Sequence, residues 1–163
     1  MTAAGLTLRD ATPKDLSLVL HLVRALAEYE RLSHEAVATE EDFRRFLFGE
    51  PRRAEALIAE WDGAPAGFAV WFYSFSTFLG RPSLYVEDVF VEAAHRGKGI
   101  GRAIFRHLAR HALARGCGRM EWSVLAWNAP SIAFYRSLGA RPREGWILKR
   151  LTGPALAALA EES

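Results

Sequence analysis

Three glycines at alternate positions, with basic residues between and beside them, form the segment of this chain best suited to bind an anion. The glycines are Gly97, Gly99 and Gly101, and the cations are Arg96, Lys98 and Arg102. Glycine lets the backbone approach a ligand and turn its N–H groups toward it, and a following helix adds its positive N-terminal end. A turn that only reverses the chain needs no such cations. The segment therefore predicts phosphate binding.

The spacing of these residues differs from that of two common phosphate-binding motifs. No Ser or Thr follows Lys98, although the P-loop needs a hydroxyl there to bind Mg²⁺. The three glycines alternate with single residues, whereas a dinucleotide-binding fold requires the GxGxxG spacing. Both nucleotide hydrolysis and hydride transfer are therefore disfavoured.

The loop at 96–101, after a strand that carries Glu87 and Asp88, resembles the acetyl-CoA pyrophosphate loop of the GNAT acetyltransferases. Residues 128–140 resemble a later motif of that family, in which an Asn opens a helix whose Tyr faces the CoA sulfur. Within the family, the sequences of four segments are similar to those of the diamine (spermidine/spermine, thialysine) acetyltransferase branch. These segments are 27–30 (AEYE), 85–88 (YVED), 128–135 (NAPSIAFY) and 144–146 (EGW). The resemblance runs from Leu8 to about Glu162.

The resemblance implies direct transfer of the acetyl group of acetyl-CoA to a primary amine, with no metal. An alkyl ammonium has a pKa of about 10.4, so its deprotonation at pH 7 costs roughly 4–5 kcal/mol. By the resemblance, Glu87 lowers that cost as a general base acting through water. Tyr135 is implied to be the general acid that assists departure of the thiolate. Strand alternation would place Glu87 and Asp88 on opposite faces unless a bulge intervenes, and we assign Asp88 a structural role.

The resemblance also implies which residues bind the two substrates. Backbone N–H groups of the strand would hold the pantetheine, and the loop and the two helix starts would hold the rest of the cofactor. The implied cofactor-binding residues are Val89, Phe90, Val91, Arg96, Gly97, Lys98, Gly99, Ile100, Gly101, Arg102, Asn128, Ala129, Pro130 and Ser131. The implied amine-binding residues are Tyr29, Glu30, Glu87, Glu121, Trp122, Ser123 and Glu144.

Two departures from the branch limit the choice of amine. Ser76 and Phe78 stand where the polyamine enzymes tend to show an acidic residue and a Trp. A long polycation would lose a counter-charge there, so a diamine or a lysine-like amino acid remains reasonable. An antibiotic amine or a protein amino group stays open, because acceptor identity in this fold lies in loops. A CoA-binding regulatory module without turnover is the alternative from another functional class.

Composition narrows the organisation of the chain and its partners. The 163 residues are 50% hydrophobic, which predicts one domain, residues 1–163, with a single core. The net charge of +2, with acids and bases interspersed, gives no reason to expect nucleic acid as a partner. No signal peptide or membrane-spanning run is found, so we expect a cytoplasmic protein without a membrane partner. The single Cys117 excludes an internal disulfide.

Hydrophobic periodicity and turn residues predict the elements that position these groups. Strands are expected at 6–9, 56–61, 66–75, 84–91, 120–125 and 146–150. Asp62-Gly63 predicts a tight turn that joins the second and third of them in a hairpin. A helix is expected to open at the capping signature of residues 12–15 and to end between Tyr29 and Leu32. Further helices are expected from Thr39 to Gly49, from the glycine loop to Gly116, at 130–138 and from Pro154. This order predicts an α/β protein with a mixed central sheet flanked by helices, which is the order of the GNAT fold. By resemblance to the diamine branch, and because its end is apolar, the chain is expected to form a homodimer.

Overall fold

The computed structural model describes residues 5–162, and the chain divides into two compact units, Met1–Trp127 and Asn128–Ser163. Each unit is described by itself. The first holds the strands β1 (Leu6–Asp10), β2 (Glu55–Trp61), β3 (Ala64–Ser76), β4 (Arg81–Val91) and β5 (Arg119–Trp122). It also holds the helices α1 (Leu16–Tyr29), α2 (Glu40–Phe46) and α3 (Ile100–Ala114). The second unit holds α4 (Ala129–Ser137) and α5 (Gly153–Glu161).

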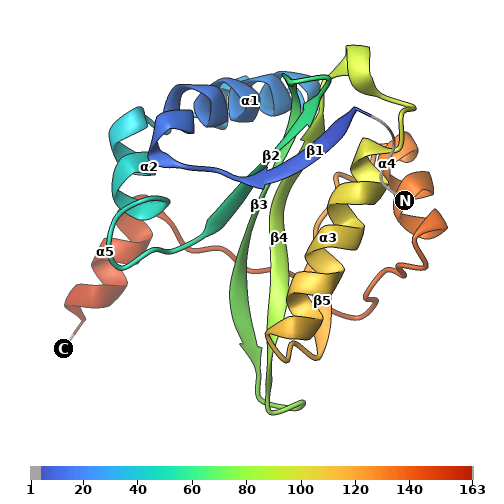
Figure 1. Cartoon of the computed structure of the whole chain (residues 1–163). Coiled ribbons are helices and arrows are strands. Elements are labelled where there is room, and N and C mark those ends of the chain that lie inside the picture. The colour runs from blue at the N-terminus through green and yellow to red at the C-terminus, as the bar shows by residue number, and fades with distance from the viewer. Residues whose placement is uncertain (1–4, 163) are drawn as a thin grey trace. The chain divides into compact units, whose positions relative to one another are not determined.

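The five strands form one sheet in sequence order, β1-β2-β3-β4-β5 (Figure 1). The first four strands pair antiparallel, and β4 and β5 pair in parallel. The predicted mixed sheet flanked by helices is therefore confirmed. Strand β5 ends at Trp122 rather than near Leu125, and its last pairing is Val86 with Trp122. Within the described chain, residues 87–91 of β4 consequently have no partner strand on that edge.

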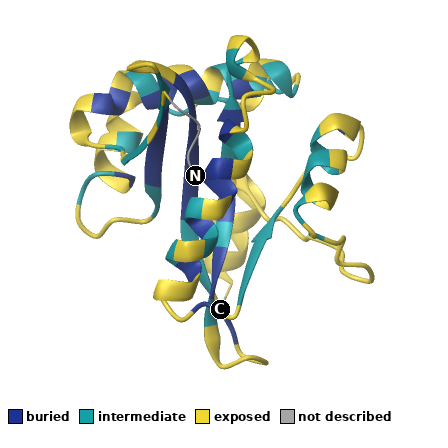
Figure 2. Cartoon of the chain, turned by 45° about the vertical axis from the view of Figure 1, so that its right-hand side comes forward, coloured by how far each residue is buried: buried dark blue, intermediate teal, exposed yellow. Residues whose placement is uncertain are grey.

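Helices α1 and α3 cover opposite faces of the sheet. The apolar side of α1 packs on side chains of β2, β3 and β4, among them Ile58, Phe68 and Phe90. On the other face, the ring of Trp71 in β3 meets the imidazole of His111 in α3, with 5.6 Å between centroids. Figure 2 shows buried residues concentrated in the strands and exposed residues on the outer sides of the helices. Burial on both faces explains the near-continuous apolar runs of β2 and β3.

A β-bulge in β4 changes which face its residues occupy. Val70 pairs with Asp88, but the next residue of β3, Trp71, pairs with Val86, so Glu87 is the extra residue. Paired residues share a face of the sheet, which places Asp88 with Val70 on the α1 side and Val86 with Trp71 on the α3 side. Simple alternation would have put Val86 and Asp88 on the same face. The bulge therefore turns Asp88 toward the end of α1.

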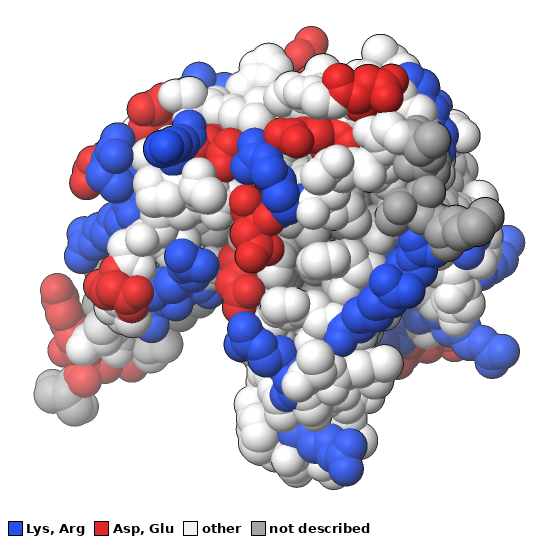
Figure 3. All heavy atoms as spheres, viewed as in Figure 1, with Lys and Arg blue, Asp and Glu red and all other residues white. Residues whose placement is uncertain are grey.

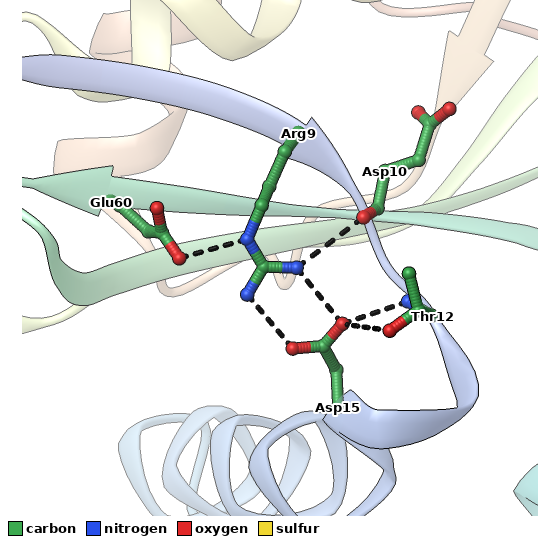
Figure 4. Close-up of polar contacts among 5 residues, drawn as sticks. All are labelled: Arg9, Asp10, Thr12, Asp15 and Glu60. Carbon is green, nitrogen blue, oxygen red and sulfur yellow. Dashed lines mark hydrogen bonds and ion pairs between the residues drawn. The ribbon is translucent and has the colours of Figure 1, made fainter.

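The start of α1 is fastened to the sheet by an ionic network (Figure 4). Arg9 donates two hydrogen bonds to the carboxylate of Asp15, at 2.9 and 2.8 Å, and one to Glu60 at 2.8 Å. Asp15 also accepts bonds from the backbone N–H and the hydroxyl of Thr12, as in a capping box. The Arg9 guanidinium is the main cause that lowers the pKa of the Asp15 carboxyl. The network joins β1, β2 and the first turn before α1.

We expect Asp15→Asn to lower the free energy of unfolding by about 1.5–2 kcal/mol at pH 7, because it removes charge-assisted hydrogen bonds. The lowered pKa of Asp15 means that this stabilisation is present above the ordinary carboxyl pKa and is lost as pH falls below it. Denaturant unfolding at pH 7 and pH 3 measures both effects. Asp42→Asn is the matched control, since Asp42 makes the same capping bonds to Thr39. Equal losses for the two variants would contradict a special role of Arg9.

In the second unit, α4 begins as predicted and the predicted strand is missing. Asn128 caps α4, with its side-chain oxygen accepting from the N–H of Ser131 at 3.3 Å. The prediction of a strand at 146–150 is wrong, because these residues form neither helix nor strand. Their apolar side chains are exposed, Ile147 at 79% and Leu148 at 83%, and no strand of the described chain pairs with them. An apolar run becomes a strand only where the edge of a sheet provides hydrogen-bond partners for its backbone.

Charge and hydropathy of the described residues add two observations. Basic and acidic side chains are interspersed on the face shown in Figure 3. This distribution agrees with the small net charge of +2. Within residues 5–162, no helix has the length and apolar character needed to cross a membrane.

Candidate active site

The glycine loop lies between β4 and α3 and has the backbone shape of an anion cradle. Gly97 and Gly99 have φ angles of 77° and 80°, in the left-handed region that favours glycine. A Cβ added at either position would meet no atom within 4 Å, so the space beside both is open. Gly99 is the N-cap of α3, and Gly101 lies within its first turn. The loop thus opens at the positive end of a 15-residue helix.

The cations of the loop also contact neighbouring aromatic rings. Arg96 donates from Nε to the carbonyl of Val91 at 3.0 Å, and its guanidinium lies 4.6 Å from the ring centroid of Tyr29. The ammonium of Lys98 lies 4.9 Å from the ring centroid of Trp61. Both side chains are exposed, as is Arg102 in the first turn of α3. Their charges therefore remain accessible to an anion at the loop.

The unpaired edge of β4 lies directly before this loop. Strand β5 ends opposite Val86, so the last residues of β4, including the predicted Val89, Phe90 and Val91, pair only with β3. An unpaired strand edge presents N–H and C=O groups that an extended ligand with amide groups can pair with. The pantetheine arm of CoA contains such amides. The loop and this edge together fit the pyrophosphate and the arm of acetyl-CoA.

Three carboxyl groups gather where the end of α1 meets the bulge, and we call Glu30, Glu87 and Asp88 the acidic group. Asp88 is half-buried, and its pKa is raised to about 7, mainly by burial and further by the charges of Glu87 and Glu30. Burial also raises the pKa of Glu30, which is the C-cap of α1. Glu87, the extra residue of the bulge, is exposed. Such a cluster attracts a cation and can accept a proton near neutral pH.

The raised pKa of Asp88 predicts a stability that depends on pH. Its ionised form is disfavoured in the folded protein, so stability falls as pH rises from the ordinary carboxyl pKa to about 7. We expect Asp88→Asn to be more stable than the parent at pH 8 by about 2 kcal/mol. A pKa shift of three units corresponds to roughly 4 kcal/mol, and we take half of it because Asp88 is only half-buried. The two proteins should converge at pH 4. Thermal melts across this range measure the difference, and a constant difference would contradict the prediction.

An aromatic cluster formed by Tyr29, Phe90 and Trp127 lies beside the acidic group. The ring of Tyr29 is 6.5 Å from that of Phe90 and 6.2 Å from that of Trp127. Phe90 is buried, whereas 47% of Trp127 is exposed. The guanidinium of Arg31 lies over Trp127, 5.2 Å from its ring centroid. The cluster joins α1, β4 and the segment after β5 into one wall.

The predicted residues of β5 take part in packing and ion pairs. Glu121 pairs with Arg119, with 3.0 Å between Oε2 and Nε. The ring of Trp122 packs against Phe105 of α3 at 4.8 Å between centroids. Ser123, just after the strand, shares a hydrogen bond of 2.8 Å with the hydroxyl of Tyr85. None of these contacts excludes a role beside the amine, which stays a prediction.

The remaining predicted residues belong to the second unit. Ala129 and Pro130 form the first turn of α4, and the half-buried Tyr135 follows in the same helix, with its ring 5.5 Å from that of Phe134. Glu144 is exposed in the segment between α4 and α5. The cap at Asn128 was predicted from the sequence and is confirmed.

Sequence reasoning missed three members of the site. Asp88 was assigned a structural role, but the structure places it in the acidic group; an adjacent acidic pair is a signal, although the bulge that orients it is not readable from one sequence. Trp127 precedes the Asn128 cap and was not singled out. Arg31 was also overlooked, although it follows Glu30 directly.

In residues 5–162 no cluster of His, Cys, Asp and Glu is arranged to hold a metal ion.

Comparisons with known proteins point to one family. A model of the acetyltransferase (GNAT) family matches residues 21–140. The thialysine N-epsilon-acetyltransferase of Bos taurus is 37% identical over 168 residues, which cover 96% of this chain and 98% of that protein. An L-ornithine N5-acetyltransferase of Arabidopsis thaliana is 31% identical over 197 residues, covering 93% and 86%. A solved integron cassette protein from the mobile metagenome of V. cholerae has a TM-score of 0.81 at 26% identity and covers 98% and 100%.

Proposed function

Because this chain belongs to the GNAT acetyltransferase family and such enzymes transfer the acetyl group of acetyl-CoA to an amine, we propose that its acceptor is a small cationic molecule. A diamine, a polyamine or a lysine-like amino acid fits this description. The observation that carries the proposal is the acidic group, whose three carboxyls lie where the unpaired edge of β4 begins. Two relatives are named as acetyltransferases of thialysine and of L-ornithine, and these names support a small cationic acceptor.

We assign proton removal from the amine to Glu87, acting through a water molecule. The ammonium form of the substrate is unreactive, and the acidic group both attracts it and supplies a carboxylate that can accept its proton. Glu87 is exposed at the bulge and can reach solvent. Asp88 supports the same step, because a pKa of about 7 lets it take up a proton at neutral pH. Acetyl-CoA supplies the activated acetyl group, and Tyr135 is proposed to donate a proton to the departing sulfur.

An assay of CoA release with a panel of amines tests this function. Diamines, polyamines, lysine analogues and aminoglycosides are each incubated with acetyl-CoA, and reactions without amine give the background hydrolysis. We expect short diamines or lysine-like amino acids to give the highest kcat/KM. Turnover only with aminoglycosides or with protein amino groups would contradict the proposed acceptor.

Glu87→Gln is expected to lower kcat/KM most at neutral pH, by about 10²-fold, because general-base catalysis contributes on the order of 10²–10⁴-fold. The loss should shrink as pH approaches the amine pKa of about 10.4, where the free amine no longer needs the base. A pH–rate profile measures this. Glu28→Gln, an equal change of charge at an exposed residue of α1, is the control. A loss that is uniform with pH would instead indicate that Glu87 positions the substrate.

We also propose that two copies of the chain form a homodimer through the second unit. Between α4 and α5, Trp146, Ile147 and Leu148 are each at least 67% exposed, and Leu156 and Leu159 of α5 are more than half exposed. Exposed apolar side chains gathered in one segment are typical of an interface. Light scattering at micromolar concentration should give twice the mass of 18.2 kDa. A fully active monomer would contradict the proposal.

A further inference from the structure

Helix α1 ends in a Schellman motif whose left-handed position is an arginine. Arg31 has a φ of 63°, its N–H donates to the carbonyl of Glu28 at 3.0 Å, and the N–H of Leu32 donates to the carbonyl of Ala27 at 2.8 Å. Glycine is the usual residue at this position, because a Cβ is strained in the left-handed region. A long charged side chain at a place that favours glycine indicates that the side chain itself has a use.

The guanidinium of Arg31 lies over the ring of Trp127. It lies 5.2 Å from the ring centroid, and that ring in turn packs beside Tyr29. A guanidinium over an aromatic ring still has N–H groups that can bind a carboxylate through two parallel hydrogen bonds. Within residues 5–162, no carboxylate forms an ion pair with Arg31, and the side chain is exposed. Its donors are therefore accessible.

Opposite charges thus lie next to each other at the end of α1. Glu30 belongs to the acidic group, whereas the guanidinium of the following residue, Arg31, lies over the ring of Trp127. A molecule with an ammonium at one end and a carboxylate at the other would match this arrangement at both ends. We propose that Arg31 binds the α-carboxylate of an amino-acid substrate whose side-chain amine faces the acidic group. This inference rests on the proposed function and narrows its acceptor from cationic amines to amino acids.

Pairs of substrates that differ only in the carboxylate test the role of Arg31. L-lysine is compared with cadaverine, and L-ornithine with putrescine, by the rate of CoA release from acetyl-CoA. We expect the parent enzyme to prefer each amino acid over its decarboxylated form by at least about 10-fold in kcat/KM. Arg31→Asn, which tolerates the left-handed backbone, should lower kcat/KM for lysine by about 10- to 100-fold. The value for cadaverine should change by less than about 3-fold.

Two further variants separate carboxylate binding from general effects. Arg31→Lys keeps the charge and should retain part of the preference for lysine. Arg45→Gln removes another exposed arginine that lies over an aromatic ring, Phe46, at 4.9 Å, and should leave both substrates unaffected. Thermal melts will establish whether every variant is folded.

The outcomes distinguish this inference from the function on which it rests. Equal losses for lysine and cadaverine in Arg31→Asn, or no loss for lysine, would overturn the role of Arg31 while leaving amine acetylation intact. A parent enzyme with the same kcat/KM for the diamines and for the amino acids would also overturn the role of Arg31 and leave amine acetylation intact. A parent enzyme that acetylates none of the four amines would overturn the proposed acceptor class and the inference together.

Discussion

Gly99→Val is expected to weaken acetyl-CoA binding by about 10²- to 10⁴-fold, while the protein stays folded. Gly99 has a φ of 80°, caps α3 and has open space where a side chain would project. The valine side chain would enter the space proposed for the pyrophosphate and would resist the left-handed backbone. Loss of two charge-assisted hydrogen bonds, at about 1.5–3 kcal/mol each, corresponds to the stated range.

Gly63→Val is the matched control for this variant. Gly63, in the turn between β2 and β3, also has a φ of 80° and no atom within 4 Å of an added Cβ. Both variants should therefore lose similar stability from backbone strain, as thermal melts without ligand will show. Acetyl-CoA at about 100 times its Kd should stabilise both the parent and Gly63→Val by roughly 2.7 kcal/mol, but not Gly99→Val. Normal stabilisation of Gly99→Val would refute the assignment of the loop.

Tyr135→Phe is expected to lower kcat by about 10²- to 10⁴-fold and to leave acetyl-CoA affinity nearly unchanged. The substitution removes only the hydroxyl, which is the proposed proton donor to the departing sulfur. The ring, half-buried in α4 beside Phe134, keeps its packing. Single-turnover kinetics measure the chemical step apart from product release.

Tyr73→Phe controls for loss of a hydroxyl elsewhere. The hydroxyl of Tyr73 is buried in β3, beside the side chain of Trp71. Its removal should leave kcat unchanged and cost little stability. A chemical step of normal rate in Tyr135→Phe would remove Tyr135 from the mechanism. Equal losses in the two variants would point to a general effect on the fold.

Features set by local chemistry could be predicted from the sequence. Asp62-Gly63 predicted a tight turn, and the structure has positive φ angles at both residues. Thr12 and Thr39 predicted helix starts, and both form capping boxes. The alternating glycines placed the loop correctly before α3. In each case the residues that form the feature are close neighbours in the chain, so one short segment contains the whole cause.

Features that depend on distant segments could not be predicted in the same way. The bulge at Glu87 results from the register between β3 and β4, and neither strand alone encodes it. The aromatic cluster brings together Tyr29 and Trp127, which are far apart in the sequence. The strand expected at 146–150 failed for a related reason, because its apolar residues match a strand pattern while no strand of the described chain accepts them.

The bulge makes β4 sensitive to insertions and deletions in a way that substitutions do not reveal. Val86 faces α3 and Phe90 faces α1 because the bulge takes one residue, Glu87, out of the alternation between the two halves of the strand. Deleting Glu87 would restore a regular pleat with both halves in place, because Val86 and Asp88 would become neighbours opposite Trp71 and Val70. Deleting Val89, a regularly paired residue, would instead make Asp88 and Phe90 neighbours on opposite faces, so one of them would leave the α1 side. Chimeras between relatives should therefore join β4 segments outside the bulge. The length of this strand constrains the evolution of the enzyme as much as the identities of its residues.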